Sequence, residues 1–151
     1  MKNSKQRIDE FVALRKIAVV GVSRKSDKFG NAIYNELKQR GKTVYAVNPN
    51  ADMVEGDRCY AGLGALPEKP DGVLIVLPPE ATLQVIRDAA AEGISYVWLQ
   101  QGANSVQGEK LAEELGLKWV SGECIFMYNE PVKSIHKVHR IFRKIFGGLP
   151  K

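Results

Sequence analysis

The fold is decided by the stretch KIAVVGVSRKSDKFG, which spans residues 16–30. Its first half is a short apolar run rich in Val, which is typical of a strand buried on both faces of a parallel sheet. The run reaches Gly21, and a polar loop with three basic residues then leads to Gly30. The stretch therefore predicts a buried strand, a loop at its carboxyl end and a helix that begins near Gly30.

Four further apolar runs follow, and segments with apolar residues at helical spacing separate most of them. The runs are TVYAVN (43–48), GVLIVLP (72–78), SYVWLQ (95–100) and KWVS (118–121). Gly41, Gly93 and Gly116 stand where the intervening helices would end. Residues 50–70 have no helical spacing, so a short edge hairpin or an irregular crossover is expected there.

This alternation predicts the α/β class: a single doubly wound Rossmann-like domain, with a five-stranded parallel sheet and helices on both faces. Short connections and right-handed crossovers favour the strand order 3-2-1-4-5, with the runs numbered along the chain. The switch point would then lie between the first and fourth strands. Ligands are expected at the carboxyl ends of the strands, beside that point.

One domain is expected over residues 1–151, with its core at about 14–126. Before the first strand, apolar residues at 8, 11, 12 and 14 predict a short amphipathic helix. After Pro131 apolar residues recur every three or four positions, which predicts an added C-terminal amphipathic helix over about 131–147. Its apolar stripe needs a cover, either this domain or another subunit.

Composition excludes several classes of protein. With 151 residues, 44% hydrophobic and 26% charged, the chain can bury a core without disulfides or a structural metal. Cys59 and Cys124 form no CxxC pair, so reduced thiols are expected. No apolar run approaches the roughly 20 residues that a membrane span needs, and the first residues are charged throughout. We therefore expect a cytoplasmic protein that does not enter a membrane.

The net charge of +5 is concentrated at the end of the chain. Residues 131–151 carry six Lys or Arg and no acid, whereas residues 1–130 have a net charge of −1. On the stripe of Lys133, Lys137, Arg140 and Lys144, no aromatic residues interleave with the basic ones, so a solvated face, a homodimer contact or a protein partner is favoured over nucleic acid.

The loop after the first strand has the outline of a phosphate site, because free N–H groups at a helix start favour an anion. It is not the dinucleotide fingerprint GxGxxG, since Ser23 replaces the second glycine, and no Gly-Lys-Ser/Thr closes a P-loop. Arg24, Lys25 and Lys28 add three positive charges against Asp27, which suits a ligand with more phosphate than NAD carries. A solvated basic turn is the alternative.

The other strand ends are neutral. Asn48-Pro49 follows the second strand, where an NAD site usually has Asp or Glu, although Asp52 and Glu55 lie just beyond. An ordinary Asn-Pro turn remains the alternative there. The third strand leads into Pro78, and the next two residues, Pro79 and Glu80, are suited to a helix start. The fourth strand leads into Gln100-Gln101-Gly102, where the two side-chain amides can form a polar rim.

No catalytic constellation is found. His136 and His139 lie on the basic C-terminal helix without other metal ligands nearby, so no metal site is expected. Cys124 follows the fifth strand without a neighbouring base, and a buried structural thiol is expected.

Six segments, taken together and in order, resemble the small stand-alone CoA-binding proteins. They are VVGVS, the basic loop to Gly30, VNPN, GDRCYAGLGALPEKPDGVLIVLPP, VWLQQGA and SGECI. Their fold is similar to the CoA-binding domain of the succinyl-CoA synthetase alpha subunit. The resemblance covers roughly residues 14–126.

The resemblance implies a set of cofactor-binding residues. Gly21, Ser23, Arg24 and Lys25 would line the diphosphate, Asn48 and Pro49 the nucleotide, Leu77 and Pro78 the adenine side, and Gln100, Gln101 and Gly102 the pantetheine. The chain departs from the synthetase twice. Asn50-Ala51-Asp52 stands where the synthetase has a lysine, and Gln101 stands where it has Glu.

The expected function is to bind coenzyme A or an acyl-CoA without catalysis. The alternatives are an NAD(P)-dependent enzyme, which Ser23 and Asn48 disfavour, and a partner or nucleic-acid docking module that uses the basic C-terminal helix.

Overall fold

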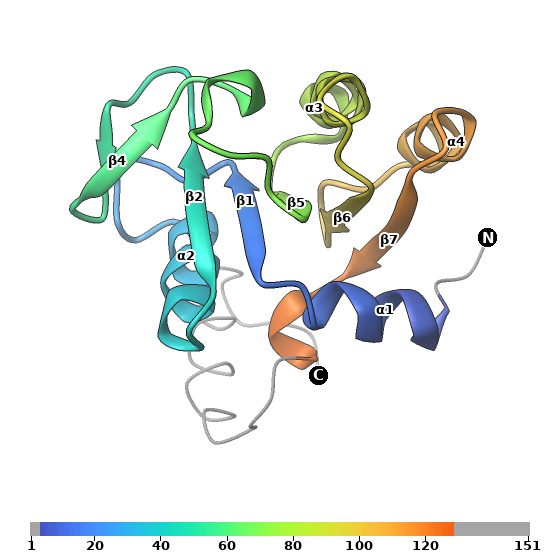
Figure 1. Ribbon diagram of the computed structural model, residues 1–151, viewed down its shortest axis with the longest axis horizontal. Helices are drawn as coiled ribbons and strands as arrows, with labels where there is room; N and C mark the ends of the chain where they lie inside the picture. Colours follow the sequence, from blue (N-terminus) through green and yellow to red (C-terminus); the bar gives the residue numbers. More distant parts are fainter. Residues whose placement is uncertain (1–3, 129–151) are drawn as a thin grey trace.

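The computed structural model describes residues 4–128, and these form one sheet with helices on both of its faces (Figure 1). All five predicted apolar runs are strands. They are β1 (Lys16–Val20), β2 (Thr43–Val47), β5 (Gly72–Ile75), β6 (Tyr96–Gln100) and β7 (Lys118–Glu123). These five strands run parallel, as expected, in the pairs β1–β2, β1–β5, β5–β6 and β6–β7, of which β1–β5 and β5–β6 were not predicted.

The predicted count of five strands is wrong, because two short strands form between β2 and β5. β3 (Met53–Val54) and β4 (Asp57–Tyr60) make an antiparallel hairpin, so the seven-stranded sheet is mixed. A hairpin is one of the two structures expected for this region. Its second strand also pairs in parallel with β2, with Ala46 opposite Cys59.

The predicted strand order is also wrong. The sheet runs β3-β4-β2-β1-β5-β6-β7, so β5 lies beside β1 and not beyond β2. The place beside β2 belongs to β4, whose sequence DRCY lacks the Val-rich run that marks the other strands. Counting the parallel strands alone, β4 is the third and β5 the fourth. The switch point therefore lies between β1 and β5.

Two hydrophobic cores lie on the two faces of the sheet. α1 (Lys5–Val12) and α2 (Phe29–Gln39) cover one face, with Phe11, Ile33 and Trp98 in its core. α3 (Pro79–Ala91) and α4 (Val106–Glu114) cover the other, and Ile86 and Trp119 are buried there (Figure 1). Short 3-10 turns follow β4 at Leu63–Ala65 and β7 at Ile125–Met127.

The helix boundaries agree with the sequence signals. α3 begins at Pro79 with Glu80 in its first turn, as expected. Gly41, Gly93 and Gly116 follow the ends of α2, α3 and α4, and each has a positive φ. The first helix begins after Ser4, whose side chain accepts a hydrogen bond from Arg7 N.

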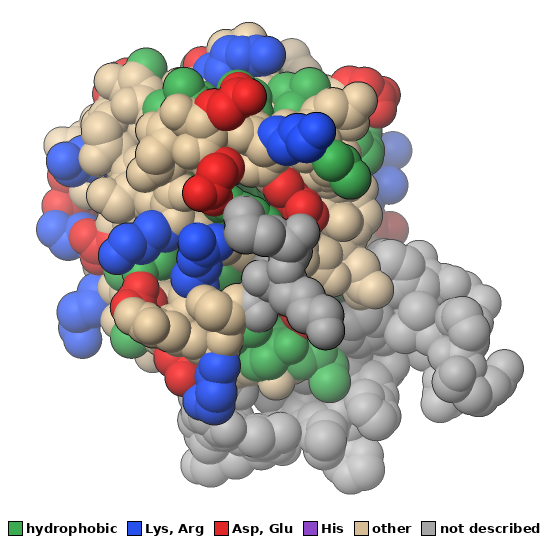
Figure 2. Space-filling model, turned by 90° about the vertical axis from the view of Figure 1, so that its right-hand side faces the viewer, with side chains coloured by type: hydrophobic (Ala, Val, Ile, Leu, Met, Phe, Trp, Pro, Cys, Tyr) green, Lys and Arg blue, Asp and Glu red, His purple; other side chains and the backbone are tan. Residues whose placement is uncertain are grey.

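Some expectations lie outside the described residues. The C-terminal helix over 131–147, with His136 and His139, is among them. Within residues 4–128, no helix is long and apolar enough to cross a membrane, and no group of three or more His, Cys, Asp or Glu is placed to hold a metal ion. On the face that carries α1, α4 and β7, acidic and basic side chains are intermixed (Figure 2).

Candidate functional site

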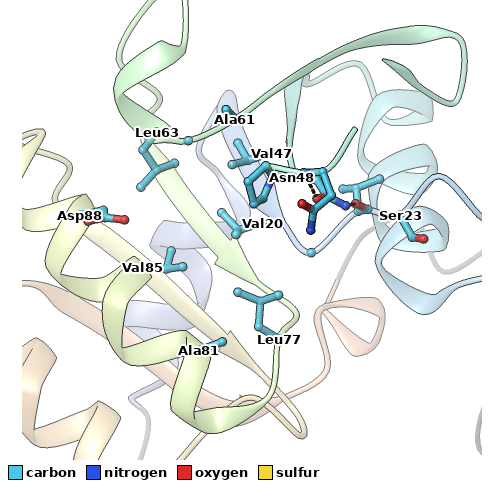
Figure 3. A pocket seen from close by; sticks show the side chains of 15 residues that line it. Val20, Ser23, Val47, Asn48, Ala61, Leu63, Leu77, Ala81, Val85 and Asp88 are labelled. Carbon is cyan, nitrogen blue, oxygen red and sulfur yellow. Dashed lines mark hydrogen bonds between the residues drawn. The ribbon is translucent and has the colours of Figure 1, made fainter. Parts of the chain in front are cut away.

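A pocket of about 450 Å³ opens at the carboxyl ends of the strands, on the α3 side of the switch point. Its walls come from the ends of β1 and β2, the loop after β4, and the face of α3 turned toward them (Figure 3). Five of the sequence-predicted residues line it. They are Gly21, Ser23, Asn48, Pro49 and Leu77.

Gly21 is required by the backbone around it. Its φ is +117°, and a Cβ at this position would lie 2.1 Å from the carbonyl oxygen of Val76, which follows β5. At Gly30 a Cβ would lie 2.5 Å from the carbonyl oxygen of Gly21. The loop after β1 is thus pressed between β5 and the start of α2. The approach of a ligand is not needed to explain Gly21, since the neighbouring strand alone already demands a glycine.

Asn31 holds this loop in place from the first turn of α2. It is fully buried, its Oδ1 accepts a hydrogen bond from Ser23 N at 2.8 Å, and its Nδ2 donates to Ser23 O at 2.7 Å. The Nδ2 also donates to Glu55 Oε2 at 2.7 Å. Both backbone groups of Ser23 are therefore fixed by one side chain. Asn31 is absent from the sequence-predicted site, because nothing in the spacing distinguishes it from other helix residues.

The three basic residues of the loop, Arg24, Lys25 and Lys28, are exposed and follow the pocket residue Ser23 along the chain, but they do not line the pocket. Within residues 4–128, Arg24, Lys25 and Lys28 form no ion pair. No side chain caps the start of α2 at Lys28. The helix end and the three cations therefore present positive potential to the same region.

Both the nitrogen and the oxygen of the Asn48 side-chain amide form hydrogen bonds to the backbone of the neighbouring loops. Its Nδ2 donates to Val22 O at 2.8 Å, and its Oδ1 accepts from Asn50 N at 2.8 Å. The ordinary turn that the sequence left open is therefore present, and it forms part of the pocket wall. The nearby acids, Asp52 and Glu55, do not line the pocket. Glu55 is held by Asn31 and by Asn35, whose Nδ2 donates to Oε1 at 3.1 Å.

One wall of the pocket was not predicted from the sequence. Ala61, Gly62 and Leu63 after β4, and Ala81, Val85 and Asp88 on α3, also line it. The first three were missed because β4 was not recognised as a strand that ends at this edge. The Glu55-Gly56 pair between two short segments was the available signal, since both residues have positive φ in a tight hairpin turn.

The structure places the last residue of β6, Gln100, and the two residues after it apart from this pocket. Gln100 is only 1% exposed, so it does not form a rim, and its Oε1 accepts a hydrogen bond from Ile125 N at 3.2 Å. Gln101 and Gly102 are exposed, and neither lines the pocket. The expected polar rim at the switch point is wrong for Gln100, because the switch lies at β5 and this amide is buried and hydrogen-bonded to the backbone that follows β7. Pro78 also lies outside the pocket lining, as the N-cap of α3.

Both cysteines are free and buried; the sequence predicted reduced thiols for both and burial for Cys124. Burial raises the pKa of the Cys124 thiol, and it also raises that of Cys59. A thiol of this kind remains protonated at neutral pH and is a poor nucleophile.

The chain has the features of a Rossmann-like domain of the kind that binds nucleotides at the carboxyl edge of its sheet. These features are a mainly parallel sheet, a glycine turn after the first strand, an uncapped helix start and a pocket at the switch point. The sequence model of the CoA binding domain family matches residues 15–130, so the chain belongs to that family.

Known proteins agree with this membership. The ADP-forming acetate–CoA ligase II of Archaeoglobus fulgidus is 33% identical over 135 residues, which cover 88% of this chain and 18% of the ligase. The chain thus spans under a fifth of that curated relative. A solved hypothetical protein from Pyrococcus horikoshii is 28% identical with a TM-score of 0.76, over 95% of this chain and 93% of its own. A conserved hypothetical protein from Pyrococcus furiosus is 40% identical with a TM-score of 0.70, over 74% of this chain and 96% of its own.

Proposed function

We propose that this chain binds coenzyme A or an acyl-CoA in the pocket at the carboxyl ends of β1, β2 and β4. The observation that carries the proposal is the loop of residues 21–30 beside that pocket. It brings an uncapped helix start together with Arg24, Lys25 and Lys28, which form no ion pair within the described part of the chain. Membership of the CoA binding domain family supports the choice of ligand.

The charge distribution favours CoA over NAD. CoA carries a ribose phosphate in addition to its diphosphate, and the three cations of the loop suit this larger charge. At the end of β2 the pocket is lined by Asn48, Pro49 and Asn50, so no carboxylate there repels a phosphorylated ribose. This is the reason that we place an NAD(P)-dependent enzyme second.

We further propose that the chain has no catalysis of its own. Cys124 is buried with a raised pKa, and no described base is hydrogen-bonded to its sulfur. The ligase relative is several times longer than this chain, and its name describes the ligation of acetate to CoA. Any chemistry on the acyl group is therefore assigned to a partner protein.

Calorimetry with CoA and with NAD tests the binding proposal. We expect CoA to bind at least tenfold more tightly than NAD. Loss of a charge-assisted contact costs about 1.5–3 kcal/mol, so Arg24→Ala is expected to weaken CoA by roughly 10- to 150-fold. Lys110→Ala, which removes an exposed charge on α4, is the matched control and should leave the affinity unchanged. Equal affinities for CoA and NAD, or no binding of CoA, would contradict the proposal.

A thioester assay tests the absence of catalysis. The purified chain is expected neither to hydrolyse acyl-CoA nor to join acids to CoA. Turnover above background that disappears in Cys124→Ser would overturn this and would make Cys124 a nucleophile. Native mass spectrometry of the purified protein is an independent measurement, since a co-purified CoA or acyl-CoA would be detected by its mass.

A further inference from the structure

The two ends of the pocket differ in chemistry. Ser23 and Asn48 lie at one end beside the basic loop, and Leu63, Val85 and Asp88 lie toward the other (Figure 3). If the phosphates occupy the loop end, the apolar end is left for the base of the same ligand. An apolar slot is the usual environment for the faces of a planar base, while a few polar groups at its edge give specificity.

The slot is formed by two elements that face each other. Ala81, Val85 and Asp88 stand four and three positions apart on α3, so they share one face of the helix. Leu63, in the 3-10 turn after β4, lies across from them (Figure 3). The aliphatic side chains supply the flat contact. Asp88 is the only acidic or basic side chain among the described residues that line this pocket.

Asp88 stands at the exposed edge of the slot, and only one of its two carboxylate oxygens has a hydrogen-bond partner among the described residues. Gln84 Nε2 donates a hydrogen bond to Asp88 Oδ1 at 2.9 Å from the preceding turn of the helix. Within residues 4–128, Oδ2 has no hydrogen-bond partner. A carboxylate accepts hydrogen bonds and donates none, so it recognises an N–H group of a ligand.

We propose that Asp88 determines specificity for adenine, by accepting a hydrogen bond from the exocyclic 6-amine of a base held between Leu63 and Val85. The proposal rests on the proposed function, because it requires a nucleotide in this pocket. It goes further by naming the residue that distinguishes adenine from a base with a 6-oxo group. A 6-oxo group would place oxygen against oxygen at this position.

The test crosses two ligands with two proteins. The ligands are ADP and purine riboside 5′-diphosphate, which differ only in the 6-amine, and each is measured by displacement of CoA. The parent chain is expected to bind ADP about tenfold more tightly, as one charge-assisted hydrogen bond predicts. In Asp88→Ala this ratio should fall to about one, while the affinity for the ligand without the amine changes little.

Two further variants separate recognition of the amine from a structural role of Asp88. Glu80→Ala removes an acidic residue from the same helix outside the pocket lining, so it should keep the tenfold ratio. Asp88→Asn keeps the size and one acceptor atom, and it serves if the alanine variant fails to fold. Its ratio should lie between those of the parent and Asp88→Ala. A purely structural role of Asp88 would lower the affinity for both ligands equally and leave the ratio intact.

The failures can be told apart. If CoA itself does not bind the parent chain, the proposed function and this inference both fail. If CoA binds but the two diphosphates compete equally, or neither competes, the pocket binds CoA without reading the amine and Asp88 has no such role. Tighter binding of GDP than of ADP would also overturn the inference, because guanine presents a 6-oxo group.

Discussion

Asn31 and Glu55 are joined by a hydrogen bond of 2.7 Å between residues 24 positions apart in the chain. Asn31 also holds both backbone groups of Ser23, while Glu55 lies in the turn of the β3–β4 hairpin. One buried amide therefore ties the loop after β1 to the hairpin at the edge of the sheet. The conformation of the proposed phosphate loop depends on a residue that does not line the pocket.

The first prediction concerns this amide. Asn31→Ala leaves the partly buried N–H and C=O of Ser23 without their partners, and each loss costs at most the roughly 1–3 kcal/mol of a fully buried unsatisfied group. We expect a lower free energy of unfolding and a CoA affinity at least tenfold weaker. Asn35→Ala is the matched control, because it removes only the second hydrogen bond to Glu55 and leaves Ser23 untouched. Urea unfolding and calorimetry measure the two effects, and equal CoA affinities in the two variants would contradict the prediction.

The second prediction concerns backbone strain at two glycines. Gly21→Ala places a Cβ 2.1 Å from Val76 O, so β5 must move, and we expect a protein that unfolds or loses CoA binding. Gly102 also has a positive φ, +99°, but a Cβ there meets nothing within 4 Å. Gly102→Ala should therefore cost only the strain of the backbone, about 1–2 kcal/mol. Thermal unfolding of both variants gives the comparison, and similar losses would show that the clash at Gly21 is relieved cheaply.

The third prediction is a loss of stability in acid. The pKa of Asp57 is lowered because Lys38 and Tyr34 both donate hydrogen bonds to its carboxylate. A carboxylate with a lowered folded-state pKa stabilises the fold above its unfolded pKa of about 3.9, and the stabilisation is lost as the pH falls through the folded value. Resistance to urea should thus weaken below about pH 4. Asp57→Asn should be less stable at pH 6 and lose less on acidification; an unchanged pH dependence in this variant would argue against Asp57.

The fourth prediction is slow alkylation of the thiols. Cys59 and Cys124 are buried, and burial raises the pKa of both. We expect iodoacetamide to modify them at neutral pH only after unfolding in urea, as followed by mass spectrometry. Because burial raises the folded-state pKa of each thiol, its contribution to stability is complete below the unfolded pKa of about 8.5. This contribution is lost as the pH rises through the folded-state pKa. Rapid modification of the folded protein would show that one thiol is accessible and reactive.

The sequence predicted the parallel strands well because strands buried on both faces are long apolar runs that stand out from their surroundings. It missed β4 because DRCY is two charged residues followed by Cys and Tyr, so its four positions show neither an apolar run nor a polar–apolar alternation. That omission alone moved β5 from its place beside β1 to a place beyond β2. A single four-residue strand thus accounts for the error in strand order.

The site was predicted at the level of loops and not of side chains. Gly21, Ser23, Asn48, Pro49 and Leu77 follow strands, and parallel strands end at one edge, so they meet. Asn31 and Asp88 come from helix faces, and their positions depend on how each helix is rotated against the sheet. Gln100 looked like a rim residue because it ends the fourth predicted strand, yet it is buried, and its Oε1 accepts a hydrogen bond from Ile125 N beyond the bulge in β7.

The hairpin at the edge of the sheet has a consequence for solubility. Without β3, strand β4 would present its outer row of N–H and C=O groups to any neighbouring extended chain. β3 pairs only Met53 with Arg58 and Val54 with Asp57, so the outermost strand is two residues long. So short a strand offers almost no template for the addition of another strand, and sheet edges of this kind resist aggregation. At this side of the molecule the sheet is protected against growth from one molecule to the next.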